Sequence, residues 1–209
     1  MCSLWPCGGR ELNAVEVEQR TDSCVVSPFF DFQRLEVAYD NLQNVSDDYG
    51  RQREFLDAFP STWWEFTLVY GYHRNDGTLN FYTRYCDHIC ALSDHMTLID
   101  DTTYCKKIIH LAVGATIDAD APNQLQDLLH AKMSVKTDIM MAVLTQLLKP
   151  EQILFWEFYW SQILRRDAAV EECRQLYDKL RLTYPNEMEM MKDAFENFCG
   201  NIRFESDRN

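Results

Sequence analysis

The chain has 209 residues, of which 46% are hydrophobic and 13% aromatic, a composition that predicts a globular fold with a sizeable core. Its 33 acidic residues outnumber its 20 basic ones, which gives a net charge of −13. A negative field repels nucleic acid and anionic lipid, so we expect no nucleic-acid partner. No uncharged apolar run approaches the ~18 residues of a membrane-spanning helix, so we also expect no membrane span.

The N-terminal residues 1–27 show no periodicity, and we interpret them as a flexible or peripheral arm. The eight cysteines are few for a disulfide-based fold, which favours reduced thiols. The sequence as given shows no complete signal peptide, which favours a cytoplasmic location. The Leu4–Cys7 segment resembles the end of a lipoprotein signal, so a start site placed too far downstream would instead imply export or a place in the cell envelope.

The stretch from Phe59 to Tyr72 is expected to form a short central helix around which the others pack. Thr62 followed by Glu65 predicts a capping box at its start, and Gly71 predicts an end with a positive φ. One helical face gathers large apolar side chains typical of a core: Trp63, Phe66, Val69 and Tyr70. A turn follows at residues 74–77. It favours a helix–turn–helix, although a two-stranded hairpin is an alternative.

Further apolar stripes at spacings of three and four residues predict about nine or ten helices. N-cap residues at 100–103 predict a helix that ends near Gly114. The segment after Pro150 is apolar over most of its circumference, so we expect it to be the most buried helix. Two helices flanking Pro185 should pack antiparallel. We therefore predict an all-α irregular helical bundle, with a single domain over residues 28–200 and a polar tail over residues 201–209.

The best candidate for a metal site lies on the helix predicted to follow the turn. Cys86 and Cys90 are four residues apart, so both thiols lie on one helical face. With His95 and His110 they would offer zinc four ligands. One helix cannot supply a tetrahedral set, however, and no second cysteine pair of metal-binding spacing occurs. Two half-buried thiols and two surface histidines, His88 and His95, are the alternative interpretation.

Other catalytic patterns are weaker. Asp127 and His130 have the spacing of half a di-iron motif, but a solvent-exposed helix face is the better interpretation of this pair. The sequence contains no GxSxG elbow and no glycine-rich phosphate loop. Aromatic side chains are numerous. Core packing is the first explanation for them, and a partner surface is the alternative for Trp63, Trp64, Tyr72, Trp156 and Trp160.

Residues 50–165 resemble an uncharacterised bacterial family of all-helical proteins. The resemblance rests on Phe59-Pro60, Glu65-Phe66 and Tyr70-Gly71-Tyr72, with Asp118-Ala-Asp-Ala farther on. Members of that family often carry lipoprotein-type N-termini, so the resemblance implies an export signal upstream. It implies no activity and assigns no site residue.

Three functional hypotheses remain from the sequence. We favour a non-enzymatic helical interaction or structural module with an unknown protein partner and no cofactor. The alternatives are a zinc-binding bundle or metal-dependent enzyme that uses Cys86, Cys90, His95 and His110, and a small-molecule-binding protein with an aromatic-lined pocket.

Overall fold

A computed structural model describes residues 30–71, 81–117, 120–161 and 166–199. Within these ranges the chain forms ten α-helices and one short 3₁₀-helix and contains no strand, which confirms the all-α prediction. The elements are α1 (Phe32–Asn44), α2 (Tyr49–Ala58), α3 (Trp63–Tyr70), η1 (Tyr82–Arg84), α4 (Tyr85–Asp94), α5 (Asp101–Ala112), α6 (Asp120–Val135), α7 (Thr137–Leu144), α8 (Lys149–Trp160), α9 (Arg166–Leu180) and α10 (Pro185–Cys199).

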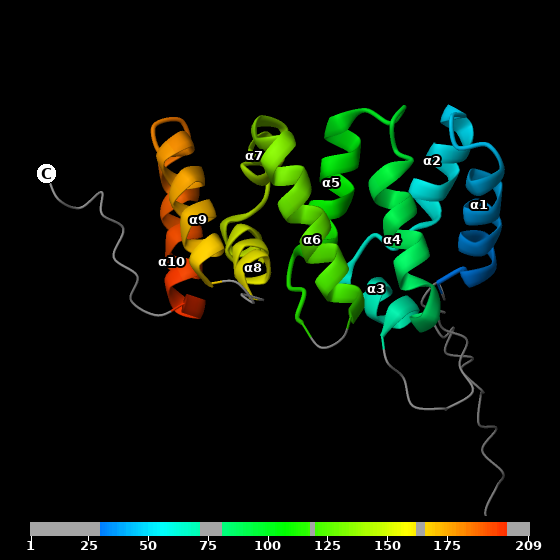
Figure 1. Cartoon of the computed structure of the whole chain (residues 1–209), viewed down its shortest axis with the longest axis horizontal. Helices are drawn as coiled ribbons and strands as arrows, with labels where there is room; N and C mark the ends of the chain where they lie inside the picture. The colour runs from blue at the N-terminus through cyan, green and yellow to red at the C-terminus, as the bar shows by residue number, and fades with distance from the viewer. Residues whose placement is uncertain (1–29, 72–80, 118–119, 162–165, 200–209) are drawn as a thin grey trace, which may run out of the picture.

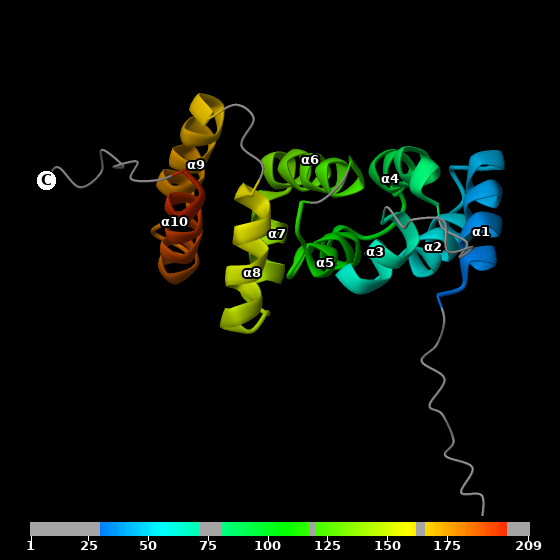
Figure 2. The same cartoon turned by 90° about the horizontal axis from the view of Figure 1, so that it is seen from below.

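The helices follow one another along the long axis of the molecule (Figure 1). Seen from below, α4 and α6 form one layer, and α3 and α5 form a second (Figure 2). At the C-terminal end α9 and α10 form an antiparallel hairpin, as the sequence predicts, and α10 packs against α8 (Figure 1). No helix in the described ranges has the length and apolar character needed to cross a membrane.

The central helix α3 begins where the sequence predicts. Thr62 Oγ1 accepts a hydrogen bond from the backbone N–H of Glu65 at 3.2 Å. The Glu65 carboxylate accepts from the N–H of Ser61 at 2.7 Å, one residue before the donor expected in a capping box. The prediction for Gly71 is wrong, because this residue follows α3 with a φ of −65° in extended backbone. The turn at 74–77 lies outside the described residues.

Helix α5 confirms both of its predicted ends. Asp100 Oδ1 accepts from the N–H of Thr103 at 2.9 Å and so caps the helix. Gly114 follows the helix with a φ of +74°, a conformation that side chains other than glycine rarely adopt. The helix therefore ends near Gly114, as predicted, because glycine can adopt this positive φ.

Eleven aromatic side chains of the described residues are buried in the core. On α3, Phe66, Val69 and Tyr70 are buried as predicted, and Trp63 is half-buried. Helix α8 buries five aromatic rings in succession apart from Glu157: Phe155, Trp156, Phe158, Tyr159 and Trp160. Its other side is open, since Ile153 and Leu154 are 36% and 40% exposed. The helix that was expected to be the most buried thus keeps one side exposed.

Candidate functional site

The predicted zinc ligands do not come together. Cys86 and Cys90 are both exposed on α4 rather than half-buried, His95 follows the end of α4, and His110 is exposed on α5, where it lines a different cavity. No group of three or more potential metal ligands occurs among the described residues. Burial, and then the neighbouring Cys86, raise the pKa of Cys90, which favours the thiol over the metal-binding thiolate.

His88 is buried, which corrects the expectation of a surface histidine. Its Nδ1 lies 3.0 Å from the hydroxyl of Tyr70. Its Nε2 lies 3.2 Å from Glu36 Oε1, although the two atoms are not aligned as a hydrogen bond. Arg84 Nη1 donates to the other Glu36 oxygen at 3.0 Å. The ring of Tyr39 packs on the imidazole, with centroids 4.7 Å apart. His88 is therefore a core residue within a polar chain that reaches the surface at Arg84.

The aromatic interaction candidates divide by burial. Trp156 and Trp160 are buried, so their rings contact the core and are not offered to a partner in this structure. Trp64 is 60% exposed. Trp63 packs against Phe158, with ring centroids 6.1 Å apart. Tyr72 lies outside the described residues.

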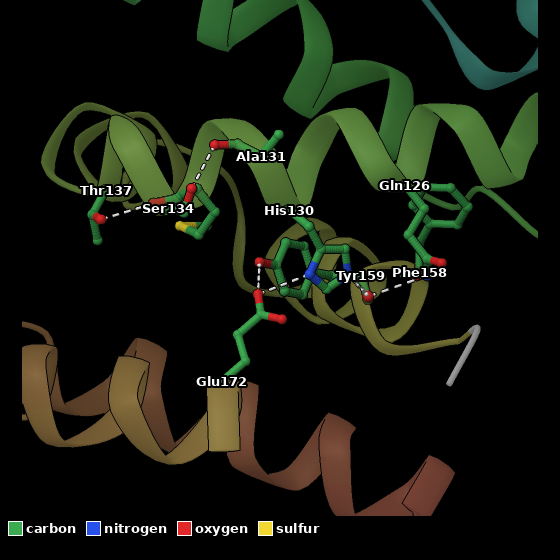
Figure 3. A network of polar contacts seen from close by, with 9 residues as sticks. Gln126, His130, Ala131, Ser134, Thr137, Phe158, Tyr159 and Glu172 are labelled. Carbon is green, nitrogen blue, oxygen red and sulfur yellow. Dashed lines mark hydrogen bonds and ion pairs between the residues drawn. The ribbon is translucent and has the colours of Figure 1, made fainter. Parts of the chain in front are cut away.

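A polar network joins α6, α8 and α9, and Figure 3 shows it at close range. His130 on α6 directs Nδ1 at Glu172 Oε1 on α9, at 2.8 Å. Its Nε2 lies 2.9 Å from the backbone oxygen of Tyr159 on α8. The Tyr159 hydroxyl donates to the same Glu172 oxygen at 2.7 Å. The expectation of a solvated helix face is therefore right for Asp127, which is exposed, and wrong for His130, which is half-buried.

Both ring nitrogens of His130 are engaged by partners on other helices. Nδ1 faces a carboxylate oxygen of α9 and Nε2 faces a backbone carbonyl oxygen of α8, so the imidazole links three helices. Burial alone would raise the pKa of Glu172. The hydrogen bond and charge of His130, with the Tyr159 hydroxyl, outweigh burial and lower that pKa. No nitrogen of His130 is left to act as a base, so this network works as a cross-link between helices.

Replacing Glu172 with glutamine should destabilise the fold at pH 7 by about 1–2 kcal/mol, because two charge-assisted hydrogen bonds at a partly exposed site are weakened. Since the pKa of Glu172 is lowered in the folded state, its stabilisation is present above the unfolded pKa and is lost as the pH falls through the folded one. Urea titrations of wild type and Glu172→Gln should therefore converge in acid. Glu171→Gln, at an exposed neighbouring position, is the control. An equal loss in both variants would contradict the cross-link.

The cavity beside this network has a volume of about 320 Å³ and is bordered by Ser134, Thr137 and Lys179. Its polar groups already have protein partners. Ser134 donates to the carbonyl of Ala131 at 2.8 Å, Thr137 donates to that of Met133 at 2.7 Å, and Lys179 donates to Thr137 at 3.1 Å. The Ser134 hydroxyl therefore bonds within α6, and the Thr137 hydroxyl at the start of α7 bonds back to α6.

A larger and more apolar hollow lies between α8, α10 and the segment that links α5 to α6. We call it the α8 groove. Its volume is about 390 Å³, and Leu154 and Phe198 at its border are 40% and 49% exposed. The remaining lining is contributed by the segment 114–117 and by Glu157, Phe158 and Ser161. Phe158 also contacts Trp63, so the groove adjoins the aromatic helix α3.

No family model, no curated protein and no solved structure matches the chain.

Proposed function

We propose that the chain is a helical interaction module that binds a basic amphipathic helix of a partner protein in the α8 groove. The observation that carries the proposal is the open side of α8. A helix with five buried aromatic rings also exposes Ile153 and Leu154, and the exposed side continues into a hollow of about 390 Å³. Apolar helix faces are recognised in such hollows through side chains one helical turn apart.

The charge of the chain supports the choice of partner. Glu157 lines the groove, and the whole chain carries a net charge of −13. A helix with lysines beside its apolar face would be attracted to this surface. Two copies of the chain would instead repel each other, which disfavours self-association through the groove. Location in the cell envelope remains a prediction from the family resemblance.

Fluorescence anisotropy with a synthetic helical peptide tests the proposal, with leucines on one face of the peptide and lysines on the other. Its binding should weaken about tenfold in Leu154→Glu, because a charge then replaces an apolar side chain that would contact the leucine face of the peptide. Leu182→Glu is the matched control, since Leu182 is 91% exposed in the turn between α9 and α10. A peptide with glutamates in place of lysines should bind more weakly than the lysine peptide.

Equal binding of the lysine peptide to both variants would mean attraction to the charged surface in general and would overturn the proposal. Sedimentation of the wild type tests whether a second copy of the chain occupies the groove. A dimer that Leu154→Glu dissociates would mean that a second copy fills the groove, in place of a basic helix.

A further inference from the structure

Ser61 and Lys107 both line a cavity between α2 and α5. Lys107 Nζ lies 2.7 Å from Ser61 Oγ and donates to the backbone oxygen of Phe59 at 2.5 Å. The cavity has a volume of about 280 Å³. Leu56 gives it an apolar wall, and Lys106 and His110 line it as well. Ser61 is exposed, so its hydroxyl is accessible from solvent.

The surroundings of Lys107 make its amine easier to deprotonate than an exposed lysine. The pKa of Lys107 is lowered to about 8, chiefly by burial, with Glu65 and Asp57 acting in the opposite direction and Arg34 and Arg53 adding to the decrease. About half of the molecules therefore carry an uncharged amine near pH 8. In that form one N–H still donates to Phe59, while the nitrogen lone pair accepts the hydroxyl proton of Ser61.

We propose that Ser61 and Lys107 form a nucleophile–base pair that hydrolyses small carboxylic esters in this cavity. An adjacent base with depressed basicity is the general requirement for an activated serine. The apolar wall at Leu56 suits a short acyl chain. Lys106 and His110 line the same cavity and bring potential hydrogen-bond donors to it, and Asp57 also lines it. This activity is separate from binding in the α8 groove and goes beyond it.

The reaction balances with water as the only second reactant. Ser61 Oγ attacks the ester carbonyl carbon and its proton passes to Lys107 Nζ. The carbon–oxygen bond to the leaving alcohol breaks, and Lys107 returns the proton to that alcohol. Water then attacks the acyl-Ser61 ester and gives a proton to Lys107. The carboxylic acid leaves as the proton returns to Ser61 Oγ.

A fluorophosphonate probe tests this pair, with peptide mass mapping to locate the adduct. The probe should label Ser61 in the wild type, with a rate that rises with pH about a midpoint near 8. Ser61→Ala should abolish this adduct. Lys107→Met should slow labelling by about 100-fold or more, the usual range for a lost general base. Lys179→Met is the matched control, because Lys179 also contacts a hydroxyl, that of Thr137.

Lys107→Arg controls for the possibility that Lys107→Met loses labelling because it unfolds. Arginine retains a donor for the Phe59 carbonyl but stays protonated, so labelling should fall while the circular dichroism spectrum is kept. Hydrolysis of p-nitrophenyl acetate should follow the same order of variants. An unlabelled Ser61, or labelling that neither Lys107 variant slows, would show that Lys107 only caps the end of α2 and would overturn the proposal. Leu154→Glu should leave labelling unchanged, which separates this test from that of the groove.

Discussion

Replacing Trp160 with alanine should destabilise the fold by about 3–5 kcal/mol, the usual cost of removing a large aromatic ring from a core. The Trp160 ring lies between three helices. It contacts Phe195 of α10 edge-on at 4.9 Å between centroids, His130 of α6 at 5.7 Å, and Tyr159 within α8 at 4.7 Å. Its loss leaves a void at the contact between α8 and the C-terminal hairpin. Urea unfolding followed by far-ultraviolet circular dichroism measures the change.

Trp64→Ala provides the comparison, because the same deletion at a residue that is 60% exposed should change stability by only about 0.5 kcal/mol or less. The contrast also separates the aromatic interaction candidates of the sequence into core and surface positions. Similar losses in the two variants would contradict the placement of Trp160 described here.

The second large effect is an acid destabilisation that depends on His88. Burial, and then the nearby charge of Arg84, lower the pKa of His88 to about 4, while Asp87 acts in the opposite direction. The unfolded state keeps the ordinary value of about 6.5 and binds more protons between these two values. Stability is therefore full above pH 6.5 and falls by up to about 3 kcal/mol as the pH drops to 4.

His88→Gln should remove this part of the pH dependence, since glutamine does not titrate in the window. The other groups facing His88 remain in place: Tyr70, Glu36, Arg84 and Asp87. Burial raises the pKa of Glu36, and Arg84 offsets part of this rise. Glu36 therefore adds its own pH dependence to the free energy of unfolding, and it does so equally in both proteins. The measurement is the free energy of unfolding at several values between pH 7 and pH 4.

His110→Gln controls for the loss of one histidine, at an exposed position. If the stability of wild type and His88→Gln falls in parallel over this range, His88 is not the neutral core residue that the structure describes.

The sequence predicted those helix ends that depend only on neighbouring residues. The cap at Thr62, the cap at Asp100 and the end of α5 at Gly114 each depend on atoms within a few residues, so they could be predicted without the fold. The exit from α3 at Gly71 could not, because glycine permits a positive φ without requiring one.

Pairs that are distant in sequence carry no such signal. His130 meets Glu172 across 42 residues, and Lys107 meets Ser61 across 46. Neither pair has a characteristic spacing, so a sequence search for catalytic motifs does not find them. The periodicity of α8 could not predict which side stays open either, because apolar residues occupy nearly its whole circumference. The side that stays open is decided by the positions of α5, α6 and α10, which pack against it.

The arrangement of the helices in a row has a consequence for how the chain reaches its structure. Most helices pack against partners one or two elements away along the chain, as α1 does with α2 and α9 with α10. Closing short loops loses little chain entropy, so such contacts can form early and quickly. The hairpin at the C-terminal end joins the row mainly through the contact of α10 with α8, so its docking depends on α8 being in place.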